Sequence, residues 1–363
     1  VTLKSVQDGY DNLVEIINTS NSEIDMSNAG IRVTDIVDFV KVNQLIANTS
    51  KLVTVDNISD KKALLAVINI TPNANIESAE ITVTDDVNRS EVETINTYIT
   101  TGNVTITSIT DSFSNISTVQ GTTGISIGTA LITATDAVTL DNANYLNGFT
   151  NAQVTLNAVQ DTVSNITSID GLKTTDVSMA AAAVTVTDAA SFANADAING
   201  FTTGKVTLNS VEDTYAKIQD IKSIADGEVD MGAAAVKVSD NVTKTEVDDL
   251  RTDTTGDITL TSLTEDKGDL ATINGFTDVI LSTANITVTD NVDKSEADTI
   301  DAYSNTSGTV TLTSITDTVS NVTAVNTNAN ISLATSTITV TAAASFANAD
   351  AINKFTTGKV TLN

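Results

Sequence analysis

A five-residue pattern of branched aliphatic and polar residues recurs along the chain and predicts a β-strand. Its clearest copies are ITVTD at 81–85 and again at 286–290. Branched residues and threonine at a period of two are typical of a half-buried strand. The closing acidic position recurs every 50 to 52 residues. The chain is therefore built from tandem repeats of about 51 residues.

Ten residues after the acidic position stands an apolar column, and a second apolar column precedes it by three residues. The later column is Leu45, Ile95, Leu146, Ile198, Leu250, Ile300 and Ile352, and the earlier one is Val42, Val92, Ala143, Ala195, Val247, Ala297 and Ala349. Apolar positions three apart predict one face of a short helix. Its predicted capping boxes are Ser90 with Glu93, Thr245 with Asp248, and Ser295 with Asp298.

The predicted end of this helix carries an Asn-Gly-Phe sequence in two copies, at 147–149 and 199–201. Glycine tolerates the left-handed conformation in which many helices end, and the aromatic residue is expected to pack back on the last turn.

The second half of each repeat predicts another strand, another helix and a brief third strand. The second strand includes VTIT at 104–107, and the third includes VSM at 177–179. A second acidic column lies between strand and helix, at Asp8, Asp60, Asp111, Asp161, Asp213, Glu265 and Asp317. We expect these acids to cap the second helix at its N-terminus.

These elements predict an α/β repeat solenoid, in which short parallel strands and short helices stack coil on coil into an elongated rod. The two halves of the repeat resemble each other, so the coil is expected to be a half unit of 24 to 28 residues. A single coil has no second layer against which to bury its apolar stripe, so neighbouring coils must cover it. Threonines between the core positions of the strands are expected to form ladders on the outer face.

The predicted organisation is one continuous array of about seven units over residues 1–363, within a longer chain. The units are 1–30 (partial), 31–80, 81–131, 132–183, 184–235, 236–285, 286–337 and 338–363 (partial).

The composition narrows the chemistry that is open to the chain. It has no Cys and no His, which excludes disulfides, Cys-based zinc sites and nucleophiles activated by histidine. Its net charge of −28 disfavours nucleic acid and anionic lipid surfaces as partners and favours divalent cations. No apolar run approaches 18 residues, so no membrane insertion is expected.

The first acidic column is the candidate metal site. It consists of Asp35, Asp85, Asp136, Asp188, Asp240 and Asp290, and the seventh copy has Ala342 instead. Stacked carboxylates repel each other unless screened, and Ca²⁺ takes oxygen ligands. The alternative is a turn residue whose side chain accepts local backbone N–H groups. Both interpretations stay open from sequence.

The repeat resembles those of very large secreted surface proteins of aquatic bacteria, including surface-layer and adhesin-like chains. The features that carry the resemblance are ITVTD, a helix, VTL, an acidic residue and a second helix, in this order. The resemblance extends over the whole chain and implies an extracellular structural role, often with calcium. The calcium-binding nonapeptide GGxGxDxUx is absent. The expected function is a part of a surface layer, sheath, filament or adhesin stalk at the cell surface.

Two other classes of function compete with this one. A binding module would recognise a glycan, ice or a partner protein through one face of the solenoid. An enzyme would need one coil with chemistry of its own, and because the coils look alike we expect no catalytic residues.

Matching segments near the two ends, VTLK at 1–4 and VTLN at 360–363, predict that the partners are further repeats or other copies, end to end, with cell-surface polysaccharide as a further candidate.

Overall fold

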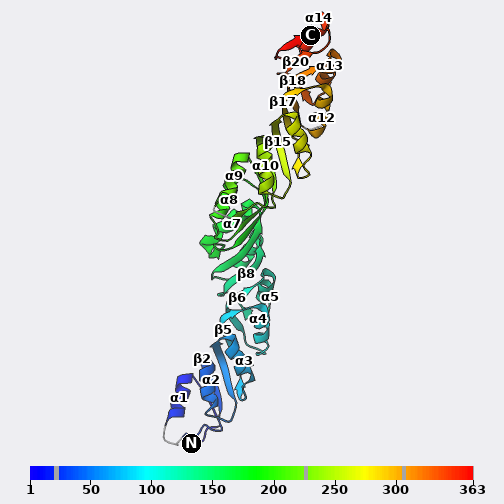
Figure 1. Ribbon diagram of the computed structural model, residues 1–363. Coiled ribbons are helices and arrows are strands. Elements are labelled where there is room, and N and C mark those ends of the chain that lie inside the picture. Colours follow the sequence, from blue (N-terminus) through cyan, green and yellow to red (C-terminus); the bar gives the residue numbers. More distant parts are fainter. Residues whose placement is uncertain (20–23, 225–227, 305–307, 363) are drawn as a thin grey trace. The chain divides into compact units, whose positions relative to one another are not determined.

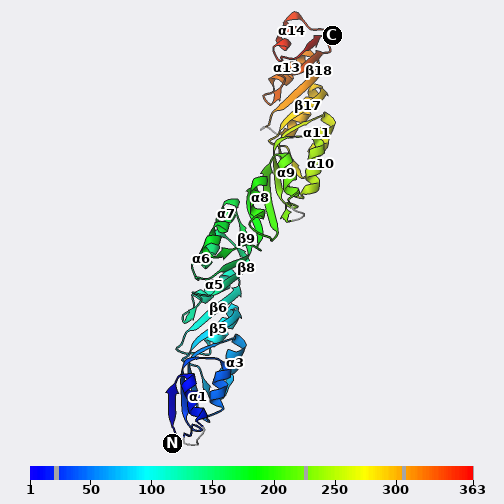
Figure 2. The same cartoon turned by 90° about the vertical axis from the view of Figure 1, so that its left-hand side faces the viewer.

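The structure is a computed structural model that describes residues 1–19, 24–224, 228–304 and 308–362. The chain divides into two compact units, Val1–Ala182 and Ala183–Asn363. The division falls one residue before a predicted repeat boundary. Figures 1 and 2 show the ribbon, in which strands and short helices alternate along each unit.

The described part of the first unit contains seven α-helices and ten strands. Its helices are α1 (Tyr10–Asn18), α2 (Phe39–Ile46), α3 (Lys62–Ile70), α4 (Arg89–Asn96), α5 (Phe113–Gln120), α6 (Leu140–Asn147) and α7 (Val163–Gly171), which is followed by the 3₁₀ turn η1 (Leu172–Thr175). Its strands are β1 (Ser5–Asp8), β2 (Gly30–Val37), β3 (Val53–Asp60), β4 (Ala74–Asn75), β5 (Glu80–Val87), β6 (Val104–Asp111), β7 (Ile125–Ser126), β8 (Leu131–Val138), β9 (Val154–Asp161) and β10 (Val177–Ser178).

The described part of the second unit repeats the plan with seven further α-helices. They are α8 (Phe192–Asn199), α9 (Tyr215–Lys222), α10 (Lys244–Asp253), α11 (Lys267–Asn274), α12 (Lys294–Ser304), α13 (Val319–Thr327) and α14 (Phe346–Asn353). Its strands are β11 (Ala183–Ala190), β12 (Val206–Asp213), β13 (Val229–Asp230), β14 (Ala235–Val242), β15 (Ile258–Glu265), β16 (Val279–Ile280), β17 (Asn285–Val292), β18 (Val310–Asp317), β19 (Ile331–Ser332), β20 (Thr337–Val340) and β21 (Val360–Leu362).

The coil is one long strand with the helix that follows it, so the predicted half unit is confirmed. From β2 onward, the long strands of each unit begin alternately 23 to 25 and 27 to 29 residues apart. Within each unit, a long strand pairs in parallel with the next one, as β5 does with β6 through Thr82 and Thr105. The predicted third strand is a two-residue segment, such as β7, which pairs beside the start of the preceding long strand.

The core of each unit lies between the helices and one face of its sheet. In β6, the side chains of Val104 and Ile106 are fully buried, whereas Thr105 and Thr107 on the other face are half-buried. The strand loses this alternation after Thr107, so that Ile109 is buried as well. The alternation with a period of two therefore distinguishes the helix-covered face of the sheet from its outer face, as predicted. Neighbouring threonines form the expected outer ladders, for example Thr110, Thr133 and Thr155.

The helical columns supply the other side of this core. All seven members of the later column, from Leu45 to Ile352, have at most 2% of their surface exposed. In the earlier column only Ala349 is not buried. The predicted helix faces are therefore confirmed.

The prediction for the helix ends is wrong in one respect. Gly148 and Gly200 do close their helices, but their φ angles of −74° and −70° are right-handed. The aromatic residue packs back as expected, since the rings of Phe149 and Tyr145 lie 4.5 Å apart between centroids. No helix of the described chain is both long and apolar enough to cross a membrane.

Candidate functional site: the carboxylate ladder and the helix hollows

Members of both acidic columns make the same contact in space. Within the two units as the structure describes them, eleven of these carboxylates each accept a hydrogen bond from the backbone N–H of the first residue of the helix in the preceding coil. The pairs are Asp35 with Tyr10, Asp60 with Phe39, Asp85 with Lys62, Asp111 with Arg89, Asp136 with Phe113, Asp161 with Leu140, Asp213 with Phe192, Asp240 with Tyr215, Glu265 with Lys244, Asp290 with Lys267 and Asp317 with Lys294. We call these eleven carboxylates the carboxylate ladder. The positive end of each of these eleven helix dipoles thus faces a negative charge from the next coil.

A β-bulge puts the first acidic column into the ladder. In β5 the register with β6 shifts between Val83 and Asp86, so that Thr84 and Asp85 together face a single residue. The threonine on β6, Thr107, donates its hydroxyl to the carbonyl of Val83 at 2.8 Å. Bulges re-aim side chains, and here the bulge turns the Asp85 carboxylate toward α3. Asp188 occupies the same bulge position in β11.

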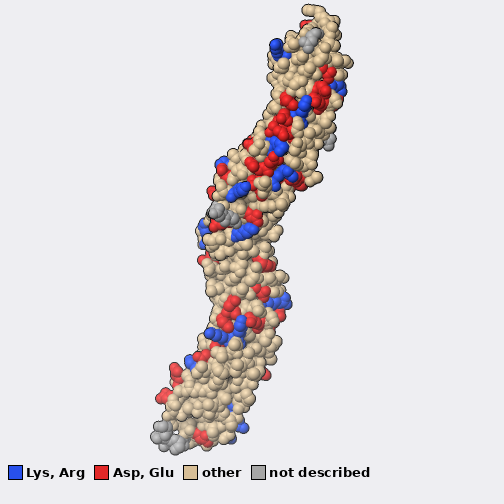
Figure 3. All heavy atoms as spheres, viewed as in Figure 1, with Lys and Arg blue, Asp and Glu red and all other residues tan. Residues whose placement is uncertain are grey.

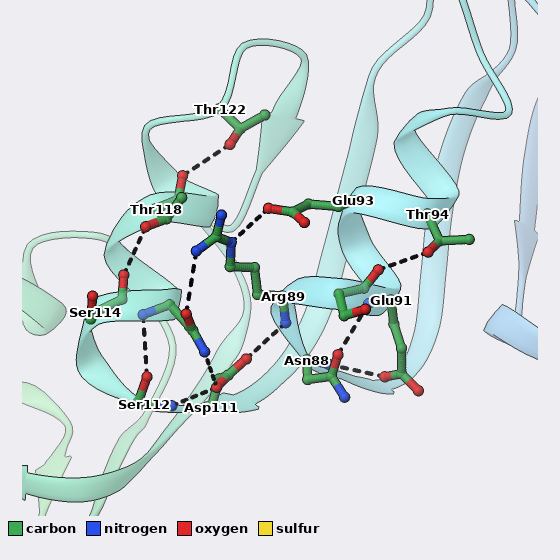
Figure 4. Close-up of polar contacts among 12 residues, drawn as sticks. Asn88, Arg89, Glu91, Glu93, Thr94, Asp111, Ser112, Ser114, Thr118 and Thr122 are labelled. Carbon is green, nitrogen blue, oxygen red and sulfur yellow. Dashed lines mark hydrogen bonds and ion pairs between the residues drawn. The ribbon is translucent and has the colours of Figure 1, made fainter.

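The second acidic column needs no bulge, because it lies at the last residue of a strand. Figure 4 shows Asp111, whose carboxylate accepts the N–H of Arg89 at 2.9 Å and the N–H of Ser112 at 2.8 Å. It also accepts the side-chain amide of Asn115 at 2.8 Å. The N-cap of α5 is Ser112. The prediction that the acid itself is the cap is therefore wrong by one residue, and sequence reasoning missed its bond to the neighbouring coil.

These contacts lower the pKa of several ladder carboxylates. Burial by itself would raise the pKa of Asp111, but the N–H groups of Arg89 and Ser112 and the amide of Asn115 outweigh it. The pKa of Asp161 and that of Asp317 are lowered by the same balance. The folded state therefore stabilises the ionised forms of these three carboxylates.

The predicted capping boxes are shifted by two residues. Ser90 lies inside α4, and its N-cap is Asn88, which accepts the N–H of Glu91 while the Glu91 carboxylate accepts the N–H of Asn88. The other boxes shift likewise, to Thr243 with Glu246 and Asp293 with Glu296. Each helix begins two residues earlier than predicted, because a glutamate three residues after the N-cap accepts the N-cap backbone N–H there.

The ladder offers one carboxylate per coil to a cation. The described residues contain no group of three or more acidic side chains that could hold a metal ion. Ca²⁺ takes six to eight oxygen ligands, so most of them would have to come from outside the column. We therefore assign no calcium chemistry to the ladder, and the calcium assignment of Asp35, Asp85, Asp136, Asp188, Asp240 and Asp290 stays a prediction.

Two hollows with the same lining lie between successive helices. The α3/α4 hollow encloses about 250 Å³ and is lined by Lys62, Ala63, Ser90, Glu91, Thr94, Ile95 and Tyr98. The α11/α12 hollow encloses about 220 Å³ and is lined by Lys267, Ser295, Glu296, Thr299, Ile300 and Tyr303. In each of them a lysine and a glutamate form an ion pair of 2.7 Å. In Figure 3, basic side chains lie among acidic ones around these helices.

Other coils place different side chains at the equivalent positions. Between α5 and α6, Phe113 lies where Lys62 would be, and its ring is 6.1 Å from that of Tyr145, which replaces Thr94. Between α9 and α10, the Tyr215 hydroxyl donates to Asp249 at 3.0 Å. Burial, as the larger effect, and the neighbouring Asp249 carboxylate together raise the pKa of Tyr215 to about 12.

A column of buried threonines forms hydrogen bonds to the backbone near the end of the coil, and it was not predicted from the sequence. The hydroxyl of Thr150 donates to the carbonyl of Ala130 at 2.7 Å and accepts the N–H of Ala152 at 3.0 Å. Thr254 makes the same pair of bonds with Ala234 and Gly256. The signal was present, since Thr recurs one residue after the aromatic column in copies such as 149–150 and 201–202.

Comparisons with known proteins found no matching family model, no matching curated protein and no matching solved structure.

Proposed function

We propose that this chain is a structural part of an extracellular assembly at the cell surface, such as a surface layer, sheath, filament or adhesin stalk. The observation that supports the proposal is the carboxylate ladder, because one kind of bond joins coil to coil in eleven helices. In such an array the stability is a sum of equivalent nearest-neighbour terms, so length can grow by repetition. This property suits a spacer or a scaffold.

Immunolabelling of the native organism tests the location. Antibodies against the purified chain should label intact cells as strongly as permeabilised ones, whereas a cytoplasmic marker should be labelled only after permeabilisation. If the chain behaves like the cytoplasmic marker, the proposal of a surface role is wrong.

We further propose that the chain associates end to end with further repeats or other copies. Phe346, the first residue of α14, is 89% exposed, whereas its counterpart Phe192 in α8 is half-buried with Lys217 lying 4.6 Å from its ring centroid. An apolar side chain that is half-buried in one coil and exposed at the equivalent position of another supports this proposal, because it offers a contact surface to a further coil.

Sedimentation velocity tests this association. The wild-type chain should form larger species as its concentration rises, and Phe346→Ser should weaken their formation. The matched control is Val40→Ser, at an apolar residue of α2 that is 69% exposed. A wild-type chain that stays monomeric at all concentrations contradicts the proposal.

A second candidate function is recognition of cell-surface polysaccharide. The two hollows favour it, because each combines an ion pair, hydroxyl groups and a tyrosine.

A further inference from the structure

The two hollows repeat one arrangement in two different units. Lys267, Glu296 and Tyr303 each lie 205 residues after Lys62, Glu91 and Tyr98. The positions of Ser90 and Thr94 also recur, as Ser295 and Thr299. The coils between them have neither the lysine nor the tyrosine at these positions, so the full arrangement is not a consequence of the repeat itself.

The ion pair in the α3/α4 hollow leaves hydrogen-bond donors and acceptors free for a ligand. The Lys62 ammonium donates to Glu91 at 2.7 Å and to the carbonyl of Asp86 at 3.0 Å, which leaves one of its three N–H groups. Glu91 also accepts the N–H of Asn88 at 3.0 Å, and its two oxygens have lone pairs left over. A donor and an acceptor are thus fixed side by side at the rim.

Neutral hydroxyl groups and an apolar surface complete the lining. Among the described residues, the Ser90 and Tyr98 hydroxyls have no hydrogen-bond partner, while Thr94 bonds to its own helix through the carbonyl of Ser90. Ile95 is 2% exposed, and with the half-buried Tyr98 ring it adds a hydrophobic surface. Few polar groups around an apolar surface are typical of a small-molecule site.

A sugar ring matches this lining better than other small molecules. Its hydroxyls both donate and accept, so adjacent ones can bond to a lysine and a glutamate together. Its C–H face can lie against an aromatic ring, and a hollow of about 250 Å³ has room for one ring rather than a long chain. The charges of Lys62 and Glu91 cancel, while Asp85 and Asp86 lie close enough to act on Lys62. An anionic sugar would therefore be repelled.

We propose that the α3/α4 and α11/α12 hollows are two equivalent binding sites for a neutral pyranose unit of a polysaccharide. The Lys–Glu pair and Ser90 or Ser295 bind its hydroxyls, and Tyr98 or Tyr303 packs against its apolar face. This inference rests on the second candidate function and is independent of the structural role.

Saturation-transfer NMR with methyl glycosides tests the proposal on the full chain. The probes are the neutral methyl glycosides of glucose, galactose, mannose and N-acetylglucosamine, with glucuronate as the anionic and glucosamine as the cationic comparison. At least one neutral probe should show saturable transfer with a Kd of about 1 mM, which is typical of a small contact area. No saturable transfer from any probe overturns both the inference and the polysaccharide-binding function. If only a charged probe binds, the inference that the ligand is a neutral sugar is wrong, but the polysaccharide-binding function stands.

A variant that blocks the hollows can be based on another coil of the same chain. Tyr145 replaces Thr94 at the equivalent position of α6, where its ring packs on Phe113. Thr94→Tyr with Thr299→Tyr should fill both hollows and weaken binding at least tenfold, without loss of fold by circular dichroism. The control is Thr118→Tyr, at an exposed threonine of α5 that makes the same hydroxyl-to-carbonyl bond within its helix. If the double variant binds as tightly as the wild type, the hollows are not the site.

Discussion

Asp111 shows at the residue scale how one side chain joins two coils. Its carboxylate accepts N–H groups from the preceding helix, from the N-cap of its own helix and from Asn115. A carboxylate with several such donors is stabilised in its ionised form. The aspartates of the second acidic column therefore hold the helix starts of two successive coils.

We expect Asp111→Asn to lower the free energy of unfolding by about 1 kcal/mol at pH 7, because the amide has one acceptor oxygen in place of two. The pKa of Asp111 lies below its ordinary value of 3.8 in the folded state. Its stabilising contribution is therefore complete above that value and is lost as the pH falls through the lower, folded pKa. Urea unfolding at a series of pH values measures the effect.

The control for this experiment is Asp257→Asn, which removes the same charge from an exposed loop. It corrects for the weaker self-repulsion of a chain with a net charge of −28. Equal effects of the two variants, or an Asp111→Asn effect that does not shrink as the pH falls below 3.8, would show that the ionised carboxylate contributes nothing specific.

Ile198 is the residue-scale example for the core. It is fully buried between helix and sheet in α8, so Ile198→Ala should cost about 2 to 5 kcal/mol through lost burial and a cavity. The control is Lys205→Gln, which removes an exposed ion pair with Asp230 and should cost less than about 1 kcal/mol. Chemical denaturation compares them, and equal midpoints would contradict the assigned core.

At the element scale, the helices of the described coils are short, and the ladder compensates for their length. A helix of eight residues leaves four N–H groups unpaired at its start, which is half of its backbone donors. The N-cap side chain satisfies one of them in most described helices, as Ser112 does for Asn115. The N-caps that make no such bond include Gly9 of α1 and Lys61 of α3. A ladder carboxylate satisfies another, as Asp136 does for Phe113. The elements are therefore stable only beside their neighbours.

Ala342 offers a test of this dependence, because it stands where the ladder would have an aspartate. The described structure gives the N–H of Val319, the first residue of α13, no carboxylate partner. Ala342→Asp should supply one and raise the stability of this end by about 0.5 to 1 kcal/mol.

Hydrogen exchange at the start of α13 reports the change. Protection there should increase in the Ala342→Asp variant and stay the same in Ala343→Asp, the adjacent exposed position. Equal protection in both variants would show that position 342 does not reach α13.

At the scale of the whole molecule, negative charge is distributed over all coils, and this is where a calcium effect belongs. If Ca²⁺ binds the first acidic column, millimolar Ca²⁺ should raise the melting temperature through many equivalent sites, and chelation should reverse the rise. Mg²⁺ at the same concentration is the control for simple screening of charge. Superimposed melting curves in Ca²⁺ and in chelator would contradict the calcium assignment.

The repeat period, the parallel strands and the buried columns were all evident in the sequence. Each position could be compared across seven copies, so Leu45 to Ile352 stood out as core without any coordinates. Strand and helix periodicity are local properties, and local patterns survive in a one-dimensional array because each coil meets only its neighbours.

The ladder and the hollows were decided by the tertiary structure. Asp85 and Asp111 belong to separate columns in the sequence. The bulge after Val83 brings Asp85 to the start of α3, in the same way that Asp111 lies at the start of α4 without a bulge. The hollows depend on side chains from two successive helices, so whether Thr94 or Tyr145 leaves space cannot be judged within one helix. Both features arise from contacts between residues about 20 to 30 positions apart in sequence. At this separation, sequence periodicity does not indicate where a side chain points or how much space two side chains leave between them.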